Sequence, residues 1–161
     1  MRRFLLTTAP LIAVLAACGT RPAPAGPALP AQSPPPSLGS EQRRLAALFE
    51  GTPVVFAMQR DGSLRVTVPL RYCFDRDQAR VKRPLGAVLD RLARSQAATA
   101  STLRVATPSD PGAPGLELAR ERALATRDYL MGQRLAASRL QVAGVSRTEG
   151  IEIVVADPPP H

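Results

Sequence analysis

The segment from Leu103 to Leu130, "LRVATPSDPGAPGLELARERALATRDYL", constrains the fold more than any other part of the chain. It opens with a short apolar run that is typical of a buried strand. A Pro- and Gly-rich turn follows, after which Leu116, Ala119, Ala123 and Leu130 recur at helical spacing. A buried strand that leads directly into a long helix predicts an α/β arrangement, with the helix packed on a sheet.

The rest of the domain continues this alternation of strands and helices. Residues 53–74 read as two strands around the turn Asp61-Gly62, which is a strong hairpin signal. Residues 83–96 carry apolar side chains at helical spacing, and strand patterns cover residues 101–107, 139–145 and 150–156. The order ββ-α-β-α-β-β predicts an α/β sandwich, in which two helices pack on one face of a mixed sheet. The sequence leaves open whether the strand from Val54 to Met58 joins that sheet.

The first residues of the chain read as an export signal. Two arginines precede an apolar run that is too short to span a membrane. The following "LAAC" resembles the lipobox of bacterial lipoproteins, in which the signal is cleaved before the cysteine and the cysteine is acylated; an ordinary signal peptide is the alternative. We therefore expect residues 1–17 to be a signal peptide and Cys18 to be lipidated. Gly19, in place of an aspartate, indicates the outer membrane.

Composition divides the remaining chain into four parts. Residues 18–39 follow the signal as a Pro/Ala-rich stretch that is expected to form an extended tether. Residues 40–52 are predicted to form a short linker helix, with Ser40 as N-cap and Gly51 as the stop signal. Residues 53–156 form the folded domain, and residues 157–161 are a tail.

Charge and side-chain chemistry exclude several functions. The net charge of +8 comes from 21 basic residues, of which all but Lys82 are Arg, and they are scattered among acids with no Trp for base stacking. We therefore expect no nucleic-acid partner. The single His, His161, lies in the terminal tail, which excludes His-based catalytic and metal sites from the domain. With Cys18 acylated, Cys73 has no disulfide partner and is expected to be buried and inert. No enzyme activity, metal or cofactor is predicted.

Three motifs resemble the OmpA-like C-terminal domain, the peptidoglycan-associating module of outer-membrane proteins. "YCFDRDQARVKRP" is similar to the segment that enters the first helix of that family. "LRVATPSD" is similar to its strand ending in Gly-His-Thr-Asp, with Ser109 in place of the Thr and Asp110 matching the Asp. "LELARERALATRDYL" is similar to its second helix, with Arg122 and Tyr129 at family positions.

The resemblance implies a peptidoglycan site. In the family, the Asp and the Arg hold the ammonium and the carboxylate at the free end of diaminopimelate in the stem peptide. Asp110 and Arg122 would take these roles here, and backbone N–H groups near Leu116 would add donors. Ser109 and Arg147, which lies near the family's arginines before the last strand, complete the candidate site.

The sequence also departs from the family pattern on this face. Thr107 and Pro108 replace Gly-His, the customary Tyr-Asn is absent, and "RTEGIEI" lacks the central arginines. Asp110 as a turn residue and Arg122 as a solvated helix charge are therefore the alternatives. Two functions follow from this. The first is an outer-membrane lipoprotein that faces the periplasm and tethers the membrane to diaminopimelate-type peptidoglycan. The second is a degenerate domain that binds envelope proteins instead.

Overall fold

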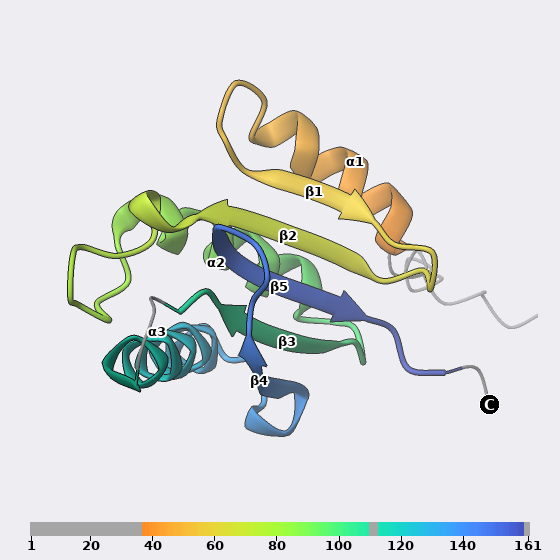
Figure 1. Cartoon of the computed structure of the whole chain (residues 1–161). Coiled ribbons are helices and arrows are strands. Elements are labelled where there is room, and N and C mark those ends of the chain that lie inside the picture. Colours follow the sequence, from red (N-terminus) through yellow and green to blue (C-terminus); the bar gives the residue numbers. More distant parts are fainter. Residues whose placement is uncertain (1–36, 110–112, 160–161) are drawn as a thin grey trace, which may run out of the picture. The chain divides into compact units, whose positions relative to one another are not determined.

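The computed structural model describes residues 37–109 and 113–159 (Figure 1). The predicted signal peptide, Cys18, nearly all of the tether, Asp110 and His161 lie outside these residues. The described residues form three helices, five strands and two 3-10 turns: α1 (Leu38–Leu48), β1 (Val55–Met58), β2 (Leu64–Pro69), η1 (Leu70–Tyr72), α2 (Arg83–Gln96), β3 (Thr102–Thr107), α3 (Ala113–Gly132), η2 (Ala137–Arg139), β4 (Leu140–Val145) and β5 (Gly150–Ala156). None of the helices described here has the length and apolar character needed to cross a membrane.

The five strands form one mixed sheet in the order β1-β2-β5-β3-β4. The β3–β4 pair is parallel and the other pairs are antiparallel. The predicted fold class is confirmed, and β1 joins the main sheet, which the sequence had left open. The register places Phe56, Val66, Ile153 and Val105 in one row across the four neighbouring strands. All four side chains are buried, so this row belongs to the core.

Helix α2 forms where its sequence pattern predicts it. Pro84 lies in the first turn, where the missing N–H costs nothing. The helix buries Leu85, Leu89 and Leu92 completely, and burial of each such side chain contributes about 2 kcal/mol. Its apolar stripe therefore fixes α2 on the sheet.

Helix α3 follows its predicted pattern less closely. Ala119, Ala123 and Leu130 are buried as expected, but Leu116 is 54% exposed. Leu116 has the right spacing for the core stripe, but it lies in the first turns of α3, beside the edge strand β4. The predicted inward position of Leu116 is wrong.

Helix α1 differs from the prediction at its start. The N-cap is Ser37 and not Ser40; the Ser37 side chain accepts a hydrogen bond from the Ser40 backbone N–H at 3.4 Å. The helix therefore begins at Leu38, within the segment that the sequence assigns to the tether. Leu38 and Leu45 are part of the core cluster, and Gln42 Nε2 donates to the carbonyl oxygen of Phe56 at 2.9 Å. Helix α1 thus packs into the same core as α2 and α3.

The opposite face of the sheet carries the polar side chains of the alternating strands. Arg65 on β2, Arg104 on β3 and Glu152 on β5 lie on this face, which we call the open face. Among the residues that the structure describes, the buried hydrophobic side chains lie between Leu38 and Val155. A fragment from Pro34 to the C-terminus therefore contains the whole core and suits the experiments below.

Candidate functional site

Arg122 is the most deeply buried charged side chain of the predicted site. Only 5% of its surface is exposed, because α3 presses it against the segment between β2 and α2. Its Nε donates to the carbonyl oxygen of Gln78 at 2.9 Å, and its Nη2 donates to that of Asp75 at 3.3 Å. The guanidinium also lies 5.3 Å from the centre of the Phe74 ring, within cation–π range. Arg122 therefore joins α3 to a loop more than forty residues earlier in the chain.

Within the described residues, Arg122 has no carboxylate partner. The ion pairs there are Glu41–Arg44, Arg65–Glu152, Lys82–Asp75 and Arg127–Asp128. A buried charge without a counter-ion is costly, and here two carbonyl acceptors and a ring face offset that cost. The hydrogen bonds of Arg122 to described residues use Nε and Nη2. Its Nη1 is the nitrogen that remains for an anionic partner.

The loop beneath Arg122 is held by its own contacts. Lys82 Nζ lies 2.9 Å from Asp75 Oδ1, and the Lys82 backbone N–H donates to the carbonyl oxygen of Cys73 at 2.9 Å. Cys73 is fully buried, and this burial raises the pKa of its thiol to about 12. The thiol is therefore protonated and inert, as the sequence predicts. These contacts hold together the loop whose carbonyl groups accept the hydrogen bonds of Arg122.

The end of β3 is bonded to α3 close to Arg122. The Thr107 hydroxyl donates to the carbonyl oxygen of Ala119, one helical turn before Arg122, and both residues are buried. Pro108 and Ser109 follow and are half-buried. Thr107 is one of the departures from the family motif, and here its side chain holds the strand against the helix.

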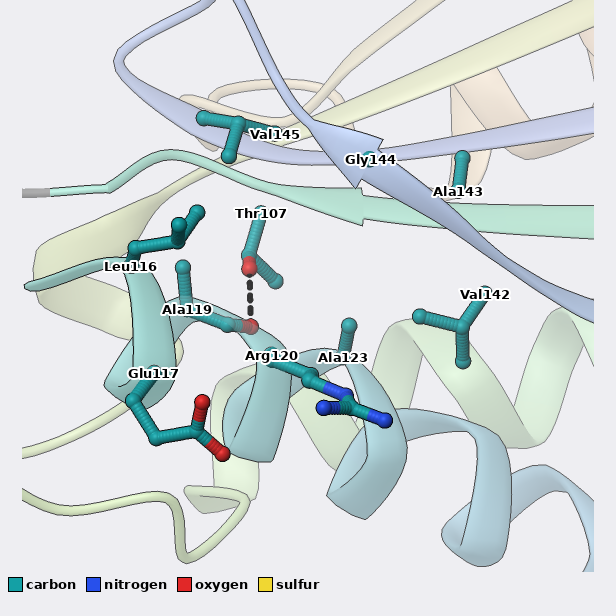
Figure 2. Close-up of a pocket in the computed structure, with 10 residues that line it drawn as sticks. All are labelled: Thr107, Leu116, Glu117, Ala119, Arg120, Ala123, Val142, Ala143, Gly144 and Val145. Carbon is teal, nitrogen blue, oxygen red and sulfur yellow. Dashed lines mark hydrogen bonds between the residues drawn. The ribbon is translucent and has the colours of Figure 1, made fainter. Parts of the chain in front are cut away.

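Leu116 and Arg147 lie in two separate hollows. Leu116 borders a groove of about 380 Å³ between α3 and β4, together with Glu117, Arg120 and Val142 (Figure 2). Arg147, in the β4–β5 connection, borders a hollow of about 440 Å³ on the open face. Arg122 lines neither hollow. The structure thus does not bring Arg122, Leu116 and Arg147 together in one pocket.

The sequence analysis missed the groups that surround these residues. The carbonyl groups that hold Arg122 carry no side-chain signal, so no motif could have shown them. Arg104 and Glu152 on the open face were visible only as polar positions of alternating strands. For metals, no three His, Cys, Asp or Glu side chains among residues 37–109 and 113–159 are placed to hold an ion.

Comparison with known proteins gives matches in structure only. No family model matches the sequence, and no curated protein matches it. A MotB-like protein from Desulfovibrio vulgaris superposes with a TM-score of 0.61 at 12% identity, over 75% of this chain and 92% of that one. The cell wall anchor of the T6SS from Pseudomonas aeruginosa gives 0.59 at 19% identity, over 78% and 100% of the two chains.

A third solved structure extends this likeness. The periplasmic domain of Helicobacter pylori MotB gives a TM-score of 0.55 at 15% identity, over 65% of this chain and 85% of that one. The chain has the fold of these domains. The sequence likeness to the OmpA-like domain is thereby confirmed at the level of fold. At these identities the comparison fixes the path of the backbone and not the chemistry of the site.

Proposed function

We propose that this protein is an outer-membrane lipoprotein whose folded domain binds peptidoglycan without a covalent bond. The observation that carries the proposal is the fold, which the chain has in common with a T6SS cell wall anchor and with periplasmic MotB domains. Acyl groups on Cys18 would hold the membrane end. The Pro/Ala-rich segment would span the gap, because such a segment stays extended without a core.

The binding site in this proposal is formed by Asp110 and Arg122. No carboxylate among the described residues pairs with Arg122. Outside them, in residues 1–36, 110–112 and 160–161, the sequence has one acidic residue, Asp110, so this is the acid left to neutralise Arg122. Three peptide units connect Thr107 to Asp110, which allows a separation of at most about 11 Å. Thr107 is hydrogen-bonded to Ala119, which lies one helical turn before Arg122. The chain therefore permits the Asp110 carboxylate to reach the Arg122 guanidinium.

The chemistry of diaminopimelate fits this pair. Its free end carries an ammonium and a carboxylate on the same carbon, so a receptor needs an anion next to a cation. Asp110 would accept hydrogen bonds from the ammonium, and Arg122 Nη1 would donate to the carboxylate. Ser109 and the first N–H groups of α3 near Leu116 would add donors to the carboxylate. Arg147 has a secondary role in the proposal, as a long-range attraction for the anionic wall.

The test is a titration of the fragment 34–161 with a stem tripeptide that ends in meso-diaminopimelate. The control ligand ends in lysine, which keeps the ammonium but lacks the adjacent carboxylate. The proposal expects amide chemical-shift changes around Ser109 and α3 with the first ligand, at least about tenfold weaker binding of the second, and loss of binding in Asp110→Asn. Equal binding of both ligands would refute the clamp.

One observation favours a second function, that of a protein-interaction module without wall binding. Two of the three guanidinium nitrogens of Arg122 are already bonded to backbone carbonyls, so its first role is to hold the loop. Under this second function, no diaminopimelate ligand would shift the spectrum. Retention of the fragment on a column of immobilised envelope proteins, with no binding to peptidoglycan, would favour it.

The location is tested separately from the binding site. In the proposal, Cys18 carries acyl chains and the domain faces the periplasm. Cells fed radiolabelled palmitate should label the full chain, and Cys18→Ala should remove the label and release the protein from the outer-membrane fraction. An unlabelled protein in the soluble periplasm would overturn the lipid anchor but leave the wall site untouched.

A further inference from the structure

The edge strand β4 is open along one side. It is the last strand of the sheet and pairs only with β3 in the described part of the chain. At the other edge, β1 is covered by α1, whose Gln42 bonds to the Phe56 carbonyl. Edge strands are normally protected by charged residues or proline, but β4 reads "LQVAGV" and has neither. An unprotected edge of this kind can accept an additional strand.

The helix side of β4 offers an apolar groove. Leu116 and Val145 are 54% and 44% exposed, and both border the groove of about 380 Å³. Figure 2 shows Val142 on the α3 side of β4, with Ala143 pointing the other way. Because the groove walls are mostly aliphatic, they fit an apolar side chain.

The open-face side of the same strand offers positive charge. Arg104 and Arg147 border the hollow of about 440 Å³ there, and both are exposed. Among the described residues neither makes an ion pair, whereas the nearby Glu152 pairs with Arg65 at 3.5 Å. Two unpaired guanidinium groups favour a carboxylate.

The two hollows have one wall in common. Residues 143–145 line both of them, and the β3–β4 register shifts at this point, so β4 has an irregularity here. A strand added along β4 would point successive side chains to opposite faces of the sheet. One side chain would enter the groove beside Leu116, and the next would lie over Arg104 and Arg147.

We propose that the β4 edge binds an extended segment of a partner protein in which apolar and acidic residues alternate. The charges decide between the possible occupants. A second copy of β4 would bring no acid to the arginines, since its sequence has none. The chain's own residues 1–36 contain no acid and many prolines, which lack the N–H that strand pairing needs.

The probe is a short synthetic peptide that alternates valine and glutamate, capped at both ends and labelled with a fluorophore. It is titrated into the fragment 34–161 by anisotropy, and the amide spectrum locates the contact. We expect a dissociation constant below about 1 mM and shifts centred on residues 140–145. A peptide with glutamine in place of glutamate should bind at least about tenfold more weakly.

Two controls separate strand pairing from simple charge attraction. A peptide N-methylated on alternate residues keeps its charges but cannot pair with β4, and it should not bind. The double variant Arg104→Glu with Arg147→Glu should bind at least about tenfold more weakly, while Arg91→Glu with Arg94→Glu, the same charge change on α2, should bind normally.

Several outcomes would overturn this proposal. They are no binding at about 1 mM, undiminished binding of the N-methylated peptide, or equal loss in both double variants. Shifts at residues 140–145 that depend on protein concentration, and that the peptide does not displace, would mean that a second copy occupies the edge. The clamp of Asp110 and Arg122 does not include the β4 edge, although Leu116 and Arg147 have a part in both proposals. The titration of the parent fragment with diaminopimelate peptides therefore tests the clamp, and the alternating peptide tests the edge.

Discussion

Replacement of Arg122 by alanine separates its structural role from a ligand role. The substitution removes a charged hydrogen bond to Gln78, a longer one to Asp75, and the contact with the Phe74 ring. The first contributes about 1.5 kcal/mol, and the longer bond and the ring contact contribute less than that each. We expect the free energy of unfolding to fall by about 3 kcal/mol.

Urea unfolding of the fragment 34–161, followed by circular dichroism, measures this difference. Arg120→Ala is the matched control, because Arg120 lies two residues away on the same helix and is exposed. The control should change the unfolding free energy by no more than about 0.5 kcal/mol. An equally small change in Arg122→Ala would refute the reasoning, since Arg122 would then be a solvated charge. A large change has a practical consequence: loss of wall binding in Arg122→Ala alone cannot identify a ligand contact.

Three further predictions concern other parts of the fold. The hydrogen bond from Arg44 lowers the pKa of the buried Glu41 carboxyl below its ordinary value of 4.5. The ionised carboxylate therefore stabilises the folded state above that pH, and this stabilisation is lost as the pH falls through the pKa of the folded state. Urea unfolding over the range from about pH 6 to pH 3 should therefore show a smaller acid loss of stability in Glu41→Gln than in the parent. Gly150→Ala should cost more than about 3 kcal/mol, because an added Cβ would overlap the Val68 carbonyl across the β2–β5 pair; a stable, folded variant by thermal melting would contradict this. Cys73 should react with a thiol reagent at pH 8 only as fast as the fragment unfolds, because burial raises its pKa to about 12; rapid labelling in native buffer would show that the thiol is accessible.

The sheet and α2 could be predicted because each pattern there has one interpretation. Alternating residues on β2 and β5 can bury only one face, so the side chains that face the core follow from the sequence. Helix α2 has a proline in its first turn and a regular apolar stripe. Its bounds were therefore predicted to the residue.

The start of α1 was predicted less well because local signals compete there. Ser37 and Ser40 are both good N-cap residues, and the choice depends on whether Leu38 finds a place in the core. That place lies in the core cluster, which strands and helices from the rest of the domain form. A tertiary contact, invisible in the local sequence, decides where the helix begins.

The candidate site was predictable in its residue types and not in its contacts. The motif pointed to Arg122, but its partners are backbone carbonyls of a distant loop, and carbonyls are present at every residue. Leu116 has core spacing yet is exposed, because periodicity does not show how much of a helix face the neighbouring elements cover. The unprotected edge at β4 likewise follows from strand order, which the sequence does not contain.

Co-sedimentation with purified diaminopimelate-type sacculi tests the central claim most directly. The parent fragment 34–161 is compared with Asp110→Asn, which leaves the bonds of Arg122 in place, and with Asp128→Asn, an exposed acid on α3 that serves as control. The account predicts that the parent and Asp128→Asn pellet with the wall at moderate salt, and that Asp110→Asn remains in the supernatant while folded. A parent fragment that stays in the supernatant, or an Asp110→Asn variant that pellets equally well, would contradict it.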